Sequence, residues 1–248
     1  MSQLYEKALK LDIQLTDHQL EQFQLYYEML VETNKVMNLT SITEYDEVLS
    51  KHFLDSLALI KGSSVDIIED LCIKQKEVSL LDIGTGAGFP AIPLKIVYPN
   101  LKVTMLDSLN KRIRFLEEVI ERLELKNIQA LHGRAEDFAK EGTPSWGREK
   151  YDIVVSRAVA TLSTLSEYCL PYVKEGGIFV AYKSEELVRE QKEAERAIGI
   201  LGGKIEKVFD FILPDTDFHR SLCVIRKVKA TPKKYPRKAG TPAKEPLK

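Results

Sequence analysis

The chain has 248 residues, of which 44% are hydrophobic, and a formal net charge of −1. This composition excludes an intrinsically disordered protein and predicts a packed core in one large domain with extensions. The three cysteines and four histidines are scattered along the chain, so the sequence predicts no metal site. Charged side chains occur within the first ten residues, and no apolar run reaches membrane-spanning length. We therefore expect no signal peptide, no contact with a membrane and a cytoplasmic location.

Residues 1–75 precede the first expected core strand and are predicted to form an N-terminal helical extension. The Thr-Asp-His-Gln run at residues 16–19 has the spacing of a capping box and predicts the start of a helix. Residues 52–57 are interpreted as the middle of a second helix, in which His52 and Asp55 are expected to pack rather than to catalyse. The first helix carries a stripe that is expected to pack on a sheet domain, namely Leu20, Phe23, Tyr27, Leu30, Val31 and Asn34.

The most informative stretch is residues 80–88, where an apolar run ends in an acid and then breaks into three alternating glycines. A helical pattern follows at residues 89–98, and a strand, a tight turn and a helix in this order open a doubly wound domain that binds a nucleotide-like ligand. The G-x-G-x-G spacing differs from the dinucleotide fingerprint, and a carboxylate beside the turn suits an ammonium group better than a pyrophosphate. The pattern therefore favours S-adenosylmethionine, with an ordinary tight turn between strand and helix as the alternative. The residues concerned are Asp82, Gly84, Gly86 and Gly88.

The segments that follow alternate between apolar runs and helical patterns, which predicts a mostly parallel sheet covered on both faces. Residues 102–107 end at Asp107, where nucleotide-binding folds place an acid that accepts hydrogen bonds from a ribose. NAD sites share this acid, so it does not distinguish the cofactors. Residues 204–211 and 221–227 are joined by too few residues for a helical crossover and are expected to pair antiparallel. The other expected strands are residues 128–131, 151–156 and 178–182.

The closing hairpin resembles that of the class I S-adenosylmethionine-dependent methyltransferase fold, a Rossmann-like α/β architecture, and we assign residues 76–228 to such a domain. Residues 229–248 form a basic tail with several prolines. Residues 226–248 carry a local charge of +8, against −9 for the rest of the chain. The prolines and the scarcity of apolar residues predict no helix and no core contact there, so the tail is either an arm for a phosphate backbone or a solubilising segment. Linker-like composition occurs at residues 62–64 and 142–147.

Taken together, the motifs resemble those of the bacterial 16S rRNA guanine-N7 methyltransferase family (RsmG), also called glucose-inhibited division protein B (GidB). Each motif is modest alone, but they occur in family order from about residue 34 to the C-terminus. They are NLT at residues 38–40, HFLDSL at 52–57, LDIGTGAGFP at 81–90, LDS at 106–108 with KR at 111–112, GRAE at 133–136, SRA at 156–158 and YPRKAGTP at 235–242. The resemblance implies methyl transfer to a single guanine, guanine 527, in the decoding-region loop of 16S rRNA, with the free rRNA or the small ribosomal subunit as substrate and a monomeric enzyme.

The resemblance also implies roles for individual residues. The acid and glycines of the turn would shape the methionine end of the cofactor pocket, Asp107 would hold the ribose, and Ala135 and Glu136 would lie at the adenine. Arg134 stands where the wider class places an acid, so it is expected to face RNA instead. The remaining candidates for cofactor contact are Phe89 and Arg157, and the candidates for RNA contact are Arg134, Lys183, Arg220, Lys111, Arg112, Arg237 and Lys238.

The expected chemistry needs no catalytic side chain, because guanine N7 has an in-plane lone pair and no proton to remove. Enzymes that methylate exocyclic amines resemble one another in an Asn/Asp-Pro-Pro-aromatic motif, and residues 156–158 do not match it. No cysteine has the setting of a cytosine-C5 nucleophile. Two other interpretations stay open: a methyltransferase for a small molecule, and a nonenzymatic cofactor-binding protein of ribosome assembly.

Overall fold

The computed structural model describes residues 2–140, 142, 147–157, 160–184 and 187–248. Ala158 of the SRA motif and most of the linker-like stretch at 142–147 therefore lie outside the described residues. In the described part of the chain, seven strands form one sheet in the order β3-β2-β1-β4-β5-β7-β6. The strands are β1 (Val78–Ile83), β2 (Leu101–Asp107), β3 (Ile128–His132), β4 (Tyr151–Ser156), β5 (Val173–Lys183), β6 (Gly203–Ile212) and β7 (His219–Lys227).

The first five strands pair in parallel, and β7 runs antiparallel to both β5 and β6. The expected hairpin is therefore present, and it closes one edge of a sheet whose other connections cross over through helices. Because the carboxyl ends of β1, β2, β3 and β4 meet at one edge where the strand order reverses, the loops after these strands gather into a single crevice.

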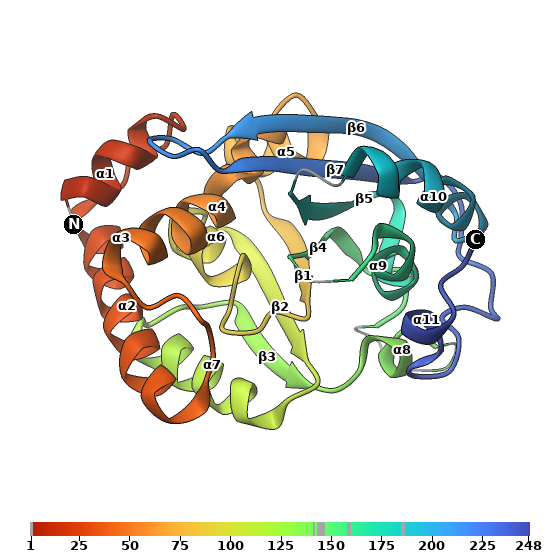
Figure 1. Ribbon diagram of the computed structural model, residues 1–248, viewed down its shortest axis with the longest axis horizontal. Coiled ribbons are helices and arrows are strands. Elements are labelled where there is room, and N and C mark those ends of the chain that lie inside the picture. The colour runs from red at the N-terminus through yellow and green to blue at the C-terminus, as the bar shows by residue number, and fades with distance from the viewer. Residues whose placement is uncertain (1, 141, 143–146, 158–159, 185–186) are drawn as a thin grey trace.

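Helices cover both faces of the sheet, as Figure 1 shows. Alternate residues of each strand point to opposite faces, so Leu80 joins one hydrophobic cluster and Leu81 the other. The first cluster lies under α1 (Ser2–Leu9), α2 (Asp17–Met37), α5 (Asp66–Cys72), α6 (Ala91–Val97) and α7 (Asn110–Arg122). The second lies under α8 (Ala135–Phe138), α9 (Leu162–Cys169) and α10 (Leu187–Ile200).

Helix α2 starts as the sequence predicts, because Thr16 and Gln19 form both hydrogen bonds of a capping box. Its buried face agrees with the expected stripe at Phe23 and Leu30, and it also includes Tyr26 and Met29. Tyr26, and not Tyr27, is fully buried, and its hydroxyl donates to the carbonyl of Ala87 in the glycine turn at 2.5 Å. The N-terminal residues therefore support the turn directly.

The segment predicted as a second helix is helical but irregular. It runs through α3 (Tyr45–Val48), a π-helical stretch η1 (Leu49–Leu54), α4 (Asp55–Leu57) and a 3₁₀ stretch η2 (Ala58–Gly62). A π-helical turn shifts the register of the side chains that follow it and is frequent at functional sites. Here it contains His52 and directly precedes Asp55.

The C-terminal tail contradicts the expectation from its composition. Residues 228–248 pack against the sheet domain, with Thr231 and Tyr235 buried, and α11 (Thr241–Lys244) forms one helical turn. Pro242 stands within the first two positions of that turn, where proline is tolerated because the N–H it lacks would be unpaired anyway. No helix in the described residues is long and apolar enough to cross a bilayer.

Candidate functional site

A cavity of about 620 Å³ opens at the carboxyl ends of the central strands. Its floor is the glycine turn after β1, and its sides come from the loops after β2, β3 and β4. The N-terminal segment contributes Thr40 and His52, α9 contributes Tyr168, and the tail contributes Gly240. The cavity-lining residues expected from the sequence are Gly84, Gly86, Phe89, Asp107, Arg112, Arg134, Ala135, Glu136 and Arg157.

The three glycines of the turn have different roles. All three have positive φ, at +72° for Gly84, +62° for Gly86 and +101° for Gly88. Apart from the glycine and its chain neighbours, no atom of the described residues lies within 4 Å of the place where a Cβ would stand on Gly84 or Gly86, whereas a Cβ on Gly88 would meet Ile92 at 2.5 Å. Gly84 and Gly86 therefore leave room for a ligand against the backbone, and Gly88 allows the helix that follows to pack closely.

Asp82 lies behind the turn and is fully buried. Its Oδ2 accepts hydrogen bonds from the Thr85 hydroxyl at 2.7 Å and from the Ala91 N–H at 3.3 Å, which ties the turn to the start of α6. Its Oδ1 has no hydrogen-bond partner among the described residues. Burial raises the pKa of the carboxyl from 3.8 to about 7, so a positive charge placed nearby would favour the ionised form.

Asp107 ends β2 and is 3% exposed. Its carboxylate accepts hydrogen bonds from the backbone N–H groups of Gly86 at 3.0 Å and Leu109 at 2.9 Å. Arg112 Nη1 lies 3.1 Å from Oδ2. The sequence assigns Arg112 to a phosphate of the RNA, whereas the structure brings its guanidinium to the acid expected at the ribose.

Phe89, His52 and Arg157 stack at one side of the cavity. The rings of His52 and Phe89 lie 4.5 Å apart at an angle of 15°, and the Arg157 guanidinium carbon lies 5.1 Å from the centre of the Phe89 ring. Burial and the Arg157 charge lower the pKa of His52 to about 3. His52 is therefore neutral near pH 7. Since arginine can only donate, Nδ1 accepts from Arg157 at 3.4 Å and Nε2 donates to the Thr40 hydroxyl at 2.9 Å.

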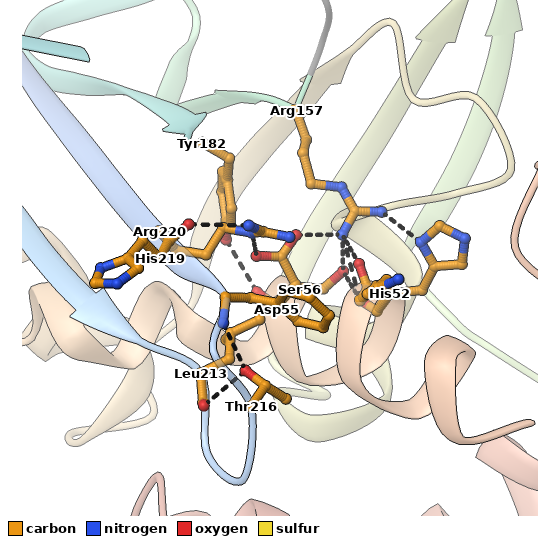
Figure 2. Close-up of polar contacts among 11 residues, drawn as sticks. His52, Asp55, Ser56, Arg157, Tyr182, Leu213, Thr216, His219 and Arg220 are labelled. Carbon is orange, nitrogen blue, oxygen red and sulfur yellow. Dashed lines mark hydrogen bonds and ion pairs between the residues drawn. The ribbon is translucent and has the colours of Figure 1, made fainter. Parts of the chain in front are cut away.

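Asp55 joins two arginines that are far apart in sequence, as Figure 2 shows. Arg157 Nη1 lies 2.9 Å from Oδ2, and Arg220 Nε lies 2.8 Å from Oδ1. The carboxylate side chain is 6% exposed, and the arginines are 17% and 24% exposed. A second cavity of about 480 Å³ lies beside this cluster and shares Arg157 and Ala160 with the first.

The other candidates for RNA contact are placed as follows. The Lys183 side chain is 9% exposed, with Nζ 2.6 Å from Glu190 and 2.8 Å from the Ala160 carbonyl. Lys111 donates to the Met37 carbonyl at 3.0 Å, Arg134 is exposed at the mouth of the first cavity, and Lys238 is exposed on the tail. Arg237 is bound to the buried Glu167 at 2.7 Å, so it anchors the tail.

Among the cavity-lining residues that sequence reasoning missed are Thr40, Tyr168 and Gly240, and His52, expected only to pack, lines the cavity as well. Thr40 and Gly240 belong to quoted motifs but stand far from the glycine turn in sequence. Tyr168 lies within a mostly buried helix, where its residue type carries no signal. In the described residues, no group of three or more His, Cys, Asp or Glu side chains could hold a metal ion.

Comparison with known proteins identifies the family. A family model described as rRNA small subunit methyltransferase G matches residues 19–218. The chain belongs to this family. It is 58% identical over 237 residues to the Ribosomal RNA small subunit methyltransferase G of Lachnoclostridium phytofermentans, which covers 96% of this chain and 93% of the relative. It is 53% identical over 235 residues to the protein of the same name from Staphylococcus saprophyticus, with 95% and 93% covered.

Solved structures agree on the fold. The crystal structure of M. jannaschii TYW2 in complex with AdoMet matches with a TM-score of 0.51 and 15% identity, covering 67% of this chain and 77% of that one. A SAM dependent methyltransferase from Aquifex aeolicus matches with a TM-score of 0.51 and 17% identity, covering 73% and 93%. The class I methyltransferase fold and the family expected from the sequence are confirmed.

Proposed function

We propose that this methyltransferase uses S-adenosylmethionine to methylate N7 of guanine 527 in the decoding-region loop of 16S rRNA. The observation that carries the proposal is the glycine turn, which lines a cavity in a chain of the rRNA small subunit methyltransferase G family. We assign the substrate from the description of the family. We assign the N7 atom from the sequence resemblance and from the chemistry of the site.

The cavity suits the cofactor in two respects. Gly84 and Gly86 leave the backbone open to close approach, and Asp82, behind the turn, has a buried carboxylate oxygen without a partner among the described residues. A cationic ammonium close to this carboxylate would compensate its burial. We assign the methionine end to the turn that Asp82, Gly84, Gly86 and Gly88 build, the ribose to Asp107, the adenine to Ala135 and Glu136, and further contact to Phe89 and Arg157.

The residues present suit a reaction that requires no general base. When bound, S-adenosylmethionine supplies a methyl group on a positively charged sulfur. Guanine N7 has a free lone pair, so the protein has to hold the two reacting atoms in line and exclude water. His52, with its pKa lowered to about 3, offers no charge near pH 7 and packs its ring on Phe89, so it contributes a neutral ring to this side of the cavity.

Arg157 is the residue best placed to orient the target base. It borders both cavities, and a guanidinium can donate to guanine O6, the acceptor beside N7. Asp55 restrains it from one side and so fixes the direction of its remaining donors. We assign Arg157 to substrate positioning and Arg220, Lys183, Arg134, Lys111 and Lys238 to contacts with the RNA.

The test is a methyl-transfer assay with labelled S-adenosylmethionine, on bare 16S rRNA and on small subunits from a strain without this gene. Label should appear at one guanine of the RNA. Reduction followed by aniline should cleave the RNA at this nucleotide, because N7-methylguanosine is sensitive to this treatment. Gly86→Asp should abolish it, because the side chain enters the cavity. Gly176→Asp is the matched control, since Gly176 is exposed, also has a positive φ of +79° and also has open space where its Cβ would stand.

The possible results separate the alternatives. Label on another atom or nucleotide would contradict the N7 assignment. Cofactor binding by calorimetry without label on either RNA would favour a small-molecule substrate or a binding role. Equal activity of Gly86→Asp and the wild type would contradict the placement of the cofactor at the turn.

A further inference from the structure

The C-terminal tail is held on the sheet domain at several points. It follows β7 and returns past α9, so that α11 lies beside α9 and α8 in Figure 1. Tyr235 is 7% exposed and belongs to the second hydrophobic cluster. Arg148 donates to the backbone carbonyls of Thr231 and Tyr235, the latter at 2.8 Å. A strongly basic segment is therefore fixed in place by contacts that do not depend on RNA.

The strongest of these anchors joins the tail to α9. Arg237 Nε and Nη2 donate to the carboxylate of Glu167 at 2.9 and 2.7 Å, and the Arg237 N–H donates to it at 2.8 Å. The Glu167 side chain is 1% exposed, so its charge depends on Arg237 for compensation. The next residue of α9, Tyr168, lines the cavity. The anchor therefore lies one residue away from the cavity wall.

Gly240 brings the tail to the cavity itself. Its N–H donates to Glu136 Oε1 at 2.8 Å, and both residues line the cavity. Gly240 has φ +84°, and within the described part of the chain no atom beyond its neighbours lies within 4 Å of the place where its Cβ would stand, so a ligand can approach its backbone closely. Glu136 follows β3, on the side where the adenine is expected. The tail thus contacts a residue assigned to the cofactor.

We propose that residues 235–242 form part of the cofactor site, as the wall that holds the adenosine end of the ligand. This inference rests on the proposed use of S-adenosylmethionine. Tyr168 supplies an aromatic ring to the same wall, and aromatic rings stack on bases. Arg237 is not among the described residues that line the cavity; it is a positioning residue that acts through Glu167 and the tail.

The experiment measures ligand binding by calorimetry without RNA, using S-adenosylhomocysteine and 5′-methylthioadenosine, which lacks the amino-acid end. Arg237→Gln and Gly240→Pro should each weaken both ligands by about tenfold or more, the size expected when a charge-assisted hydrogen bond is lost. Lys244→Gln is the control, because it removes a positive charge from an exposed position of the same segment. Thermal unfolding of each variant shows whether the domain is folded.

Each result bears on one proposal. If the wild type binds neither ligand, the assigned cofactor is wrong. If the wild type binds and both variants bind equally well, the tail is no part of the site. Weaker binding of S-adenosylhomocysteine with unchanged 5′-methylthioadenosine would overturn the assignment to the adenosine end. If Arg237→Gln does not fold, Gly240→Pro decides, because it removes the N–H that donates to Glu136 without replacing Arg237 or Glu167.

Discussion

Replacement of Asp82 by asparagine should stabilise the ligand-free protein above pH 7 and weaken cofactor binding. Burial raises the pKa of this carboxyl from 3.8 to about 7, a difference of roughly three units at about 1.4 kcal/mol each. Between these pH values the folded protein holds a proton that the unfolded chain has lost. The free energy of unfolding therefore falls as pH rises through this window, by about 4 kcal/mol in total.

Asp82→Asn removes this loss because an amide does not ionise. Its NH₂ group, if it takes the place of Oδ1, lacks a partner and costs about 1–3 kcal/mol. At pH 8 we thus expect a net gain of about 1–3 kcal/mol, the difference between these two effects. At pH 4, where the folded wild-type carboxyl is protonated, the cost of the amide dominates and the variant should be less stable than the wild type.

Urea unfolding from pH 4 to 8 measures the first effect, and calorimetry with S-adenosylhomocysteine measures the second. Since an ammonium favours the ionised carboxylate, wild-type affinity should be about tenfold lower at pH 6 than at pH 8. Asp82→Asn should bind weakly at both values. A variant that keeps the wild-type pH dependence of stability, or the wild-type affinity at pH 8, would refute the reasoning.

Three further predictions concern charged groups around the cavity. The pKa of His52 is lowered to about 3 in the folded protein, so between this value and 6.5 the unfolded chain binds a proton that the folded protein does not. The free energy of unfolding therefore falls as pH falls below 6.5, and His52→Phe should flatten the curve of stability against pH in this range. Asp55→Asn should cost about 2–4 kcal/mol in urea unfolding, since it leaves two half-buried arginines without their acid, whereas Asp215→Asn, which loses one exposed pair, should leave stability unchanged. If Lys238 binds a phosphate, Lys238→Gln should reduce the slope of log affinity against log salt by about 0.7 on single-stranded RNA, and an unchanged slope would exclude that contact.

The sheet and the glycine turn were predictable because their signals are local. A buried parallel strand appears as a continuous apolar run, and a backbone turn with positive φ requires glycine at set positions. The acid at the end of β2 and the antiparallel hairpin were predictable from local sequence signals in the same way. Residues 16–19 also form the expected capping box, because both of its hydrogen bonds lie within four residues.

The rest of the site depends on contacts between distant parts of the chain. Asp55 meets Arg157 and Arg220, which are 102 and 165 positions away, and no spacing rule links such residues. The composition of the tail led to a wrong prediction, because a few specific contacts hold the tail on the domain, among them the buried Tyr235, the ion pair of Arg237 with Glu167 and the hydrogen bond of Gly240 to Glu136. Net charge describes how a segment interacts with solvent and ions, and it does not exclude a few specific contacts.

These distant contacts change how the basic residues are interpreted. Arg112, Arg157 and Arg237 carry the same charge, yet each is bound to a buried acid: Asp107, Asp55 and Glu167. Arg112 and Arg157 line the cavity, where their remaining donors are held at a fixed place that suits recognition of a base or a cofactor, whereas Arg237 holds the tail. In the part of the chain that the structure describes, the exposed Arg134 and Lys238 form no ion pair, and an unpaired surface charge suits a phosphate backbone whose position varies. Basic residues bound to a buried acid are therefore interpreted as parts of the site, and exposed basic residues without such an acid as contacts with the RNA backbone.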